Sequence, residues 1–225
     1  MGIYRLLDAF AAQNWRASFA VNAAIADRYP QLIADIVGGG HEVVAHSTDM
    51  NGTIASGMDE GVEAELIATS LDTLERVTGS RPRGWLSIAR SQSFNTPKLL
   101  AAAGVDYMLD WVNDELPYRM TTDAGPIINL PLNHELSDRQ VITVQQQSAD
   151  SYGQQIRDAH DWLAAEAGGF GGRMLPINLT PYIMGLPYRI GALEALMGWL
   201  AAQPTVWAAS AGDIVDHCAR ADAQE

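Results

Sequence analysis

Apolar positions along the chain alternate between helical and strand spacing. Ile3, Leu6, Leu7 and Phe10 predict an amphipathic helix over residues 2–13, and the apolar run that follows predicts a strand over 16–21. Further strands are predicted at residues 41–45, 83–86, 107–111, 127–131, 174–179 and 206–208, and further helices at 22–37, 59–78, 96–103, 150–167, 191–203 and 213–221. Strands that alternate with helices are typical of a parallel α/β sheet or barrel.

The length and the absence of any linker or internal repeat favour one domain. A chain of 225 residues suits a single α/β domain that spans 1–225. A run of about 18 apolar residues, which a membrane span needs, is missing, and the first residues lack a hydrophobic signal core. We therefore expect a cytoplasmic protein.

Charge narrows the range of partners. The formal net charge is −13, with a single lysine beside thirteen arginines. A surface this acidic repels phosphate backbones and anionic lipid, so neither nucleic acid nor a membrane is an expected partner. Cys218 is the only cysteine and forms neither an internal disulfide nor a cysteine metal site.

Polar residues follow five of the predicted strands, where the loops of an α/β barrel carry the active site. These stretches are residues 46–51, 85–90, 110–114, 133–138 and 178–181. Each has an ordinary alternative as a turn or a cap. Several carboxylates and a histidine that recur at one face nevertheless indicate a site. Trp85 and Trp111 stand at strand ends and are candidates to line a pocket.

Familiar signatures of metal, nucleophile and phosphate sites are missing. No histidine or cysteine pair has ligand spacing on a helix, and the residue four positions after His46 is Met50. There is no Gly-x-Ser-x-Gly elbow, and the run at residues 38–40 precedes a strand instead of a helix. We expect no metal and no cofactor.

Several stretches resemble a known family. RASFAVNAAIADRYPQLIADIVGGGHEVVAH resembles the part of NodB-type polysaccharide deacetylases (carbohydrate esterase family 4) that ends in the histidine of their second motif. Three further stretches are similar to the branch that contains the metal-independent allantoinase: SRPRGWLSIARSQSFNTPKLLAAAGVDYMLDWVNDELPY, LPLNHELSDRQVI and GLPYRIGALEALMGWLAAQPTVWAASAGDIVDH. The resemblance covers essentially the whole chain. It implies a distorted (β/α) barrel and hydrolysis of amide C–N bonds, in N-acetyl groups or in cyclic ureides and imides.

The departures from the family pattern change the expected chemistry. The first family motif, a strand with a catalytic and a metal-binding aspartate, lies upstream of the position that matches Met1, so the barrel is expected to be incomplete. Met50 replaces the second histidine of the second motif, and Thr180 replaces the late histidine that acts as general acid. The resemblance therefore does not support the metal-dependent mechanism.

Metal-free amide hydrolysis needs a group that activates water, an oxyanion partner and a proton for the leaving nitrogen. Glu135, Asp138 or Asp110 is the candidate for activating water, and His46 is the candidate general acid. Arg90 or Asn113 is the candidate partner of the oxyanion or the substrate carbonyl. The complete set of candidate substrate contacts is Trp85, Arg90, Trp111, Asn113, Asp114 and Asn51. An acidic pocket favours a small neutral amide, ureide or amino-sugar substrate.

Two other interpretations remain open. The chain is alternatively a catalytically degenerate member that binds a ligand or pairs with another subunit, or a truncated form of a longer protein. An incomplete barrel leaves an open edge, and a homo-oligomer or a partner chain is expected to cover it.

Overall fold

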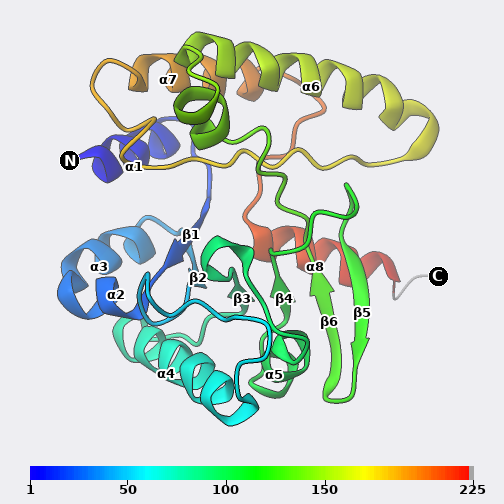
Figure 1. Cartoon of the computed structure of the whole chain (residues 1–225). Helices are drawn as coiled ribbons and strands as arrows, with labels where there is room; N and C mark the ends of the chain where they lie inside the picture. Colours follow the sequence, from blue (N-terminus) through cyan, green and yellow to red (C-terminus); the bar gives the residue numbers. More distant parts are fainter. Residues whose placement is uncertain (223–225) are drawn as a thin grey trace. The chain divides into compact units, whose positions relative to one another are not determined.

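An open, six-stranded sheet is the centre of one of two compact units in the chain. The computed structural model describes residues 1–222 (Figure 1). We call residues 16–131 with 209–222 the sheet unit, and residues 1–15 with 132–208 the helical unit. The expected fold class is confirmed: a mixed α/β protein whose sheet does not close into a complete barrel.

The sheet has the order β1-β2-β3-β4-β6-β5. Its strands are β1 (Ser18–Val21), β2 (Glu42–Ala45), β3 (Gly84–Trp85), β4 (Tyr107–Met108), β5 (Tyr118–Thr122) and β6 (Gly125–Asn129). All neighbours are parallel except β5 and β6, which form an antiparallel hairpin. Trp85 pairs with Ala45 on one side and with Met108 on the other. The residues that follow β2, β3 and β4 therefore emerge at the same edge of the sheet.

The helices of the sheet unit are α2 (Ala23–Arg28), α3 (Pro30–Gly38), α4 (Glu60–Thr78), α5 (Thr96–Ala102) and α8 (Ala211–Asp222). The sequence predicted a single helix over 22–37. The structure divides it into α2 and α3, with the break just before Pro30. Proline disfavours helical backbone in the preceding residue and lacks an N–H. The long helix α4 begins after Asp59, whose side chain accepts hydrogen bonds from two backbone N–H groups, and ends at Gly79 in the left-handed conformation.

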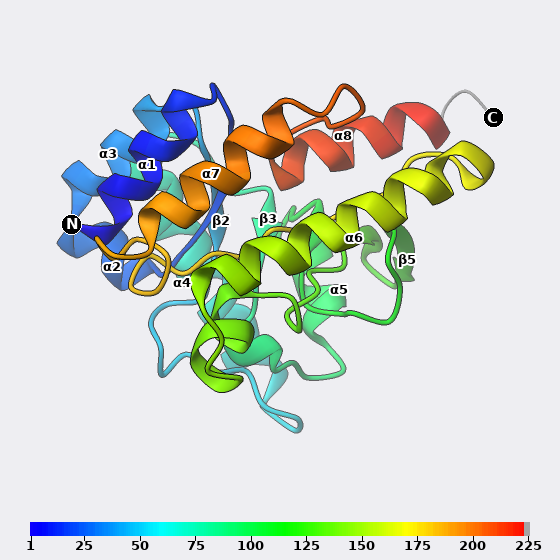
Figure 2. The same cartoon turned by 90° about the horizontal axis from the view of Figure 1, so that it is seen from above.

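The helical unit contains α1 (Gly2–Ala12), α6 (Ala149–Phe170), α7 (Ile190–Ala201) and a short π-helix, η2 (Arg139–Val144). Helix α7 lies between α1 and α6 and packs on both (Figure 2). The apolar faces of these helices and the turns before α7 form the core of this unit: Leu6, Ala9, Val141, Ile142, Tyr152, Ile156, Ile183, Met184, Leu193, Leu196, Met197 and Leu200. No helix within residues 1–222 combines the length and the apolar character that crossing a membrane requires.

Two predicted strands are wrong. Residues 174–179 form only an isolated bridge between Asn178 and Ser137, and residues 206–208 form no strand. Their apolar side chains, Leu175, Ile177, Leu179 and Val206, pack instead against the core of the helical unit. Pro176 also removes a backbone donor from the middle of the first run. Strand β5 was not predicted, since none of its residues is fully buried.

A carboxylate fastens α8 to the amino end of the sheet. Glu42 accepts hydrogen bonds from Ser18 Oγ at 2.5 Å, from the Tyr107 hydroxyl at 2.7 Å and from the backbone N–H of Gly212 at 3.0 Å. The positive end of the α8 dipole favours a negative charge at this place. The polar groups at the amino end are thus engaged in holding the fold together.

The close approach of Gly84 to Tyr107 yields a prediction about stability. A Cβ atom at Gly84 would lie 2.2 Å from Cζ of the buried Tyr107 ring. We expect Gly84→Ala to lower the free energy of unfolding, measured by urea denaturation, by about 1–3 kcal/mol, because a packed ring and strand must move. Gly198→Ala is the matched control: its Cβ meets nothing within 4 Å inside α7, and it should raise the stability by up to about 1 kcal/mol. Equal stability of the two variants would contradict this account.

Candidate active site

His46 is the first residue after β2, and one of its ring nitrogens is already engaged. Its backbone N–H donates to the Val21 carbonyl at 3.0 Å, and its Nδ1 lies 2.6 Å from the Leu86 carbonyl oxygen. A carbonyl can only accept, so Nδ1 carries the hydrogen and Nε2 keeps a free lone pair. Burial lowers the pKa of His46, more than the bond to Leu86 raises it. The imidazole is therefore a neutral proton acceptor at pH 7.

Asp110 follows β4 and receives three hydrogen bonds from the loop after β3. Its Oδ1 accepts from the Ser87 N–H at 2.8 Å, and its Oδ2 accepts from Ser87 Oγ at 3.0 Å and from Gln92 Nε2. The side chain is almost completely buried, with 4% of the residue exposed. Burial raises the pKa of Asp110 to about 6, although the bonds from Ser87 and Gln92 and the charge of Arg90 act in the opposite direction. The carboxyl group therefore changes its charge close to neutral pH.

Trp85 supports this cluster from within the core. It is fully buried, and its indole N–H donates to Ser87 Oγ at 2.8 Å. The Ser87 hydroxyl in turn donates to Asp110, so the bond that it accepts from Trp85 strengthens the bond that it donates to the carboxylate. The sequence suggested Trp85 as part of a pocket wall, whereas the structure buries its side chain in the core.

The backbone is strained beside these side chains. Five non-glycine residues among those described have a positive φ, and three of them flank the cluster: Ser47 (64°), Ala89 (51°) and Arg90 (55°). Each such conformation costs on the order of 1–3 kcal/mol and persists only where the surroundings hold it. Ser47 follows His46 directly, and its hydroxyl donates to the Gly52 carbonyl at 2.6 Å. Strain of this kind concentrates at functional sites, and here it lies at the carboxyl edge of the sheet.

The loop after β4 presents the next candidates. The backbone of Trp111 is held by Asn129, which accepts from its N–H at 3.2 Å and donates to its carbonyl at 2.8 Å. Asn113 accepts a hydrogen bond from the Tyr118 hydroxyl at 2.7 Å, and Asp114 accepts from two following backbone N–H groups. Asp114 is thus engaged in a local turn, whereas Trp111 keeps 41% of its surface exposed.

Asn51 lies in the polar loop after His46. It is exposed, and its backbone N–H donates to Asp49 Oδ1 at 2.7 Å. The turn that Asp49 organises therefore places Asn51 at the surface of the sheet unit.

Asp138 and Glu135 belong to the helical unit, whereas the other two predicted catalytic residues, His46 and Asp110, belong to the sheet unit. The Asp138 carboxylate is fully buried and accepts from Thr180 twice, from its N–H at 2.6 Å and from its hydroxyl at 2.9 Å. Burial raises the pKa of Asp138 against the effect of those bonds. Asp138 therefore ties two loops together, while Glu135 is exposed.

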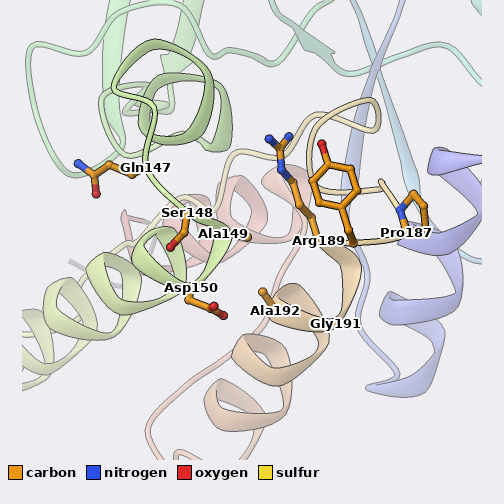
Figure 3. Close-up of a pocket in the computed structure, with 9 residues that line it drawn as sticks. Gln147, Ser148, Ala149, Asp150, Pro187, Arg189, Gly191 and Ala192 are labelled. Atoms are coloured by element: carbon orange, nitrogen blue, oxygen red, sulfur yellow. The ribbon is translucent and has the colours of Figure 1, made fainter.

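A cavity of about 470 Å³ opens between the starts of α6 and α7 in the helical unit (Figure 3). Gln147, Ser148 and Asp150 line one side, and Pro187 and Arg189 line the other. None of the predicted site residues lines it. This cavity is therefore separate from the candidate catalytic residues His46 and Asp110.

Comparison with known proteins places the chain in a family. The polysaccharide deacetylase family model matches residues 3–108. A probable polysaccharide deacetylase from Pseudomonas aeruginosa PAO1 is 30% identical, with a TM-score of 0.88 over 97% of this chain and 73% of that one. The PuuE allantoinase is also 30% identical, with a TM-score of 0.87 over 96% and 71%. A putative polysaccharide deacetylase from Mycobacterium smegmatis is 25% identical, with a TM-score of 0.84 over 98% and 78%. No curated protein sequence matches. The chain belongs to the polysaccharide deacetylase family.

The residues present do not fit the metal set that the family resemblance implies. His46 stands at the position of one ligand, but the next position is Met50, whose side chain points to solvent with 64% of the residue exposed. Within residues 1–222, no three side chains among His, Cys, Asp and Glu are grouped so that they could hold an ion. A thioether is also a poor ligand for the divalent ions that hydrolases use.

The sequence did not single out Ser87 or Gln92 as site residues. Ser87 lies within the candidate stretch at residues 85–90 and within the second stretch quoted for its similarity to the family, which were the available signals. Gln92 stands in a polar loop between two serines, and nothing in its sequence context distinguishes it. Both are recognised only through their bonds to Asp110.

The raised pKa of Asp110 predicts a pH-dependent contribution to stability. The folded protein binds this proton more tightly than the unfolded chain, where the pKa is near 3.8. The contribution of Asp110 to the free energy of unfolding is therefore greatest below about pH 4 and is lost as the pH rises to about 6. The stability of the wild type relative to Asp110→Asn should fall across this window in urea denaturation, with Asp114→Asn measured beside it as the control for a lost surface charge. A difference that stays constant with pH would show that Asp110 is not buried as described.

Proposed function

We propose that the protein hydrolyses the C–N bond of a small neutral amide without a bound metal ion, with His46 as its proton-transfer residue. The observation that carries the proposal is the bond between His46 Nδ1 and the Leu86 carbonyl, which leaves Nε2 as an acceptor at the carboxyl edge of the sheet. Family membership supports a hydrolase of the deacetylase or amidohydrolase type.

The tautomer of His46 refines its role. A neutral imidazole takes a proton from water as the water attacks the amide carbon, and the resulting imidazolium returns the proton to the departing nitrogen. His46 is thus the base of the first step and the general acid of the second. Leu86 holds the ring in one orientation in both steps, because Nδ1–H stays bonded to its carbonyl.

The other groups of the sheet unit supply electrostatic support. Arg90 lies close enough to Asp110 for its charge to lower the pKa of that carboxyl group. We assign Arg90 to the oxyanion that forms when the carbonyl is attacked, because a guanidinium in a partly buried site stabilises developing negative charge. Asp110 holds the loop that carries Arg90 and balances its charge while ionised.

The substrate class follows from charge and from the relatives. A chain with a net charge of −13 disfavours an anionic substrate. The relatives are described as polysaccharide deacetylases and as an allantoinase, so the two candidate classes are an N-acetylated amino sugar and a cyclic ureide. Both are neutral, and both contain an amide C–N bond.

A second candidate function is supported by the edge of the sheet. The carbonyls of Ala17 and Val21 accept from β2, so the backbone groups of Ser18 and Ala20 face away from it. Within residues 1–222 these outward groups have no backbone partner, and Ala20 is exposed. A free edge of this kind accepts a strand from another chain. A non-catalytic member that pairs through β1 is therefore the alternative.

Substitution of His46 tests the catalytic proposal. We expect His46→Ala to lower kcat by about 10²–10⁴-fold, the range for loss of a general acid–base residue. The assay measures acetate release from a panel of N-acetyl amino sugars and ring opening of a panel of cyclic ureides. His217→Ala, an exposed histidine in α8, is the control and should keep full turnover. Equal turnover of His46→Ala and the wild type would rule out the proposed role.

The pH dependence provides a separate check on His46. The neutral imidazole is the active form, and its pKa lies below the ordinary 6.5. The value of kcat/KM should therefore be flat above about pH 6.5 and should decline on the acid side. A decline that begins above that pH would contradict a base with a lowered pKa.

Chelation tests metal independence. Dialysis against EDTA, followed by metal analysis, should leave turnover within about twofold of the untreated protein, because the described residues offer no grouped ligands. A loss of activity that Zn²⁺ or Mn²⁺ restores would overturn this part of the proposal. A chain with no turnover under either condition would favour the alternative of a binding subunit.

A further inference from the structure

The side-chain amide of Gln92 is bonded at both ends. Its Nε2 donates to Asp110 Oδ2, and its Oε1 accepts from the indole N–H of Trp111 at 2.9 Å. An indole nitrogen can only donate, so the amide oxygen must face Trp111 and the amide nitrogen must face the carboxylate. Gln92 therefore has a single orientation that satisfies both neighbours.

Trp111 is consequently held at two places. Asn129 binds its backbone N–H and carbonyl, and Gln92 binds its ring nitrogen. Yet 41% of the residue stays exposed, and so does nearly all of Phe94, two positions after Gln92 (98%). An aromatic side chain that is both exposed and fixed has already lost its rotamer entropy, which is the condition for a preorganised binding surface.

The anchor of this arrangement is the Asp110 carboxylate. It holds the start of the strained loop through Ser87 and the later part through Gln92. Between these two points lie the left-handed residues Ala89 and Arg90. The position of the indole thus depends on the same carboxylate that holds the proposed oxyanion partner in place.

We propose that Gln92 is a positioning residue that fixes the indole of Trp111 as a wall against which the flat face of a ring-shaped amide substrate lies. The inference rests on the proposed function and narrows its substrate to a ring that carries the amide bond. Trp111 is adjacent in sequence to Asp110, so a ring stacked on the indole has its polar edge near the carboxyl end of β4. Gln92 itself touches no reacting atom.

The first arm of the test needs no activity. In a ¹H–¹⁵N spectrum, the indole N–H signal of Trp111 is the one missing from Trp111→Phe. We expect Gln92→Leu, which keeps the size and removes both bonds, to shift this signal and to speed its exchange with water by about fivefold or more, the factor of one ordinary hydrogen bond. Gln31→Leu is the control, since Gln31 donates to Asp35 at 2.8 Å elsewhere in the sheet unit. An unchanged Trp111 signal in Gln92→Leu overturns the proposal.

The second arm uses two ring probes, hydantoin for cyclic ureides and N-acetylglucosamine for amino sugars. At least one should shift the Trp111 signal of the wild type, and its Kd should rise about fivefold in Gln92→Leu and remain unchanged in Gln31→Leu. The probe that binds identifies the substrate class. If neither probe reaches Trp111, or if the Kd is the same in Gln92→Leu, the inference is wrong.

Turnover separates this inference from the proposed function. With a substrate that is hydrolysed, Gln92→Leu should raise KM about fivefold and change kcat less than about twofold. The reason is that Trp111 contributes to substrate binding and takes no part in proton transfer. A larger effect on kcat than on KM would contradict a positioning role. Binding that depends on Gln92 without any hydrolysis would leave the inference standing and would refute the proposed function.

Discussion

Three hydrogen bonds to one buried carboxylate hold the candidate site together. Asp110 lies at the end of β4, and its partners Ser87 and Gln92 lie in the loop that leaves β3. That loop contains two consecutive left-handed residues, which need external support to persist. Without the carboxylate, the loop would lose the contacts that place Arg90 and that orient Trp111. The same burial that raises the pKa of Asp110 makes the bonds strong, because few water molecules compete for them.

His46 connects to this loop through the neighbouring backbone. Its ring donates to the carbonyl of Leu86, the residue before Ser87. The proton acceptor and the carboxylate clamp are therefore fastened to adjacent residues of one strand end. The Leu86 carbonyl orients the His46 ring and Ser87 binds Asp110, whereas Met50 is exposed to solvent where the family pattern has a histidine.

Most of the helices and the inner strands could be predicted from the sequence. Regular apolar spacing located α1, α4, α6, α7 and α8 within a few residues, since each buries one face over several turns. The predictions failed where apolar runs were short. Residues 174–179 contribute Leu175, Ile177 and Leu179 to the core of the helical unit without joining a sheet, and local pattern cannot tell a strand from an apolar loop that covers a core. The hairpin strand β5 was missed for the opposite reason, because little of it is buried.

The sequence by itself determined the alternation of strands and helices, the family resemblance, and the replacement of a ligand histidine by Met50. These properties depend only on which residue stands at a position and on the spacing of residues along the chain, so the sequence contains them. Only the tertiary structure decided which polar residues cooperate. It joined Gln92 to Asp110 and Trp111, buried Trp85 beneath Ser87, and engaged Asp138 with Thr180. Except for the local bond between Trp85 and Ser87, these partnerships depend on distances between segments that are far apart in the chain, and hydrogen bonds form only within about 3.2 Å.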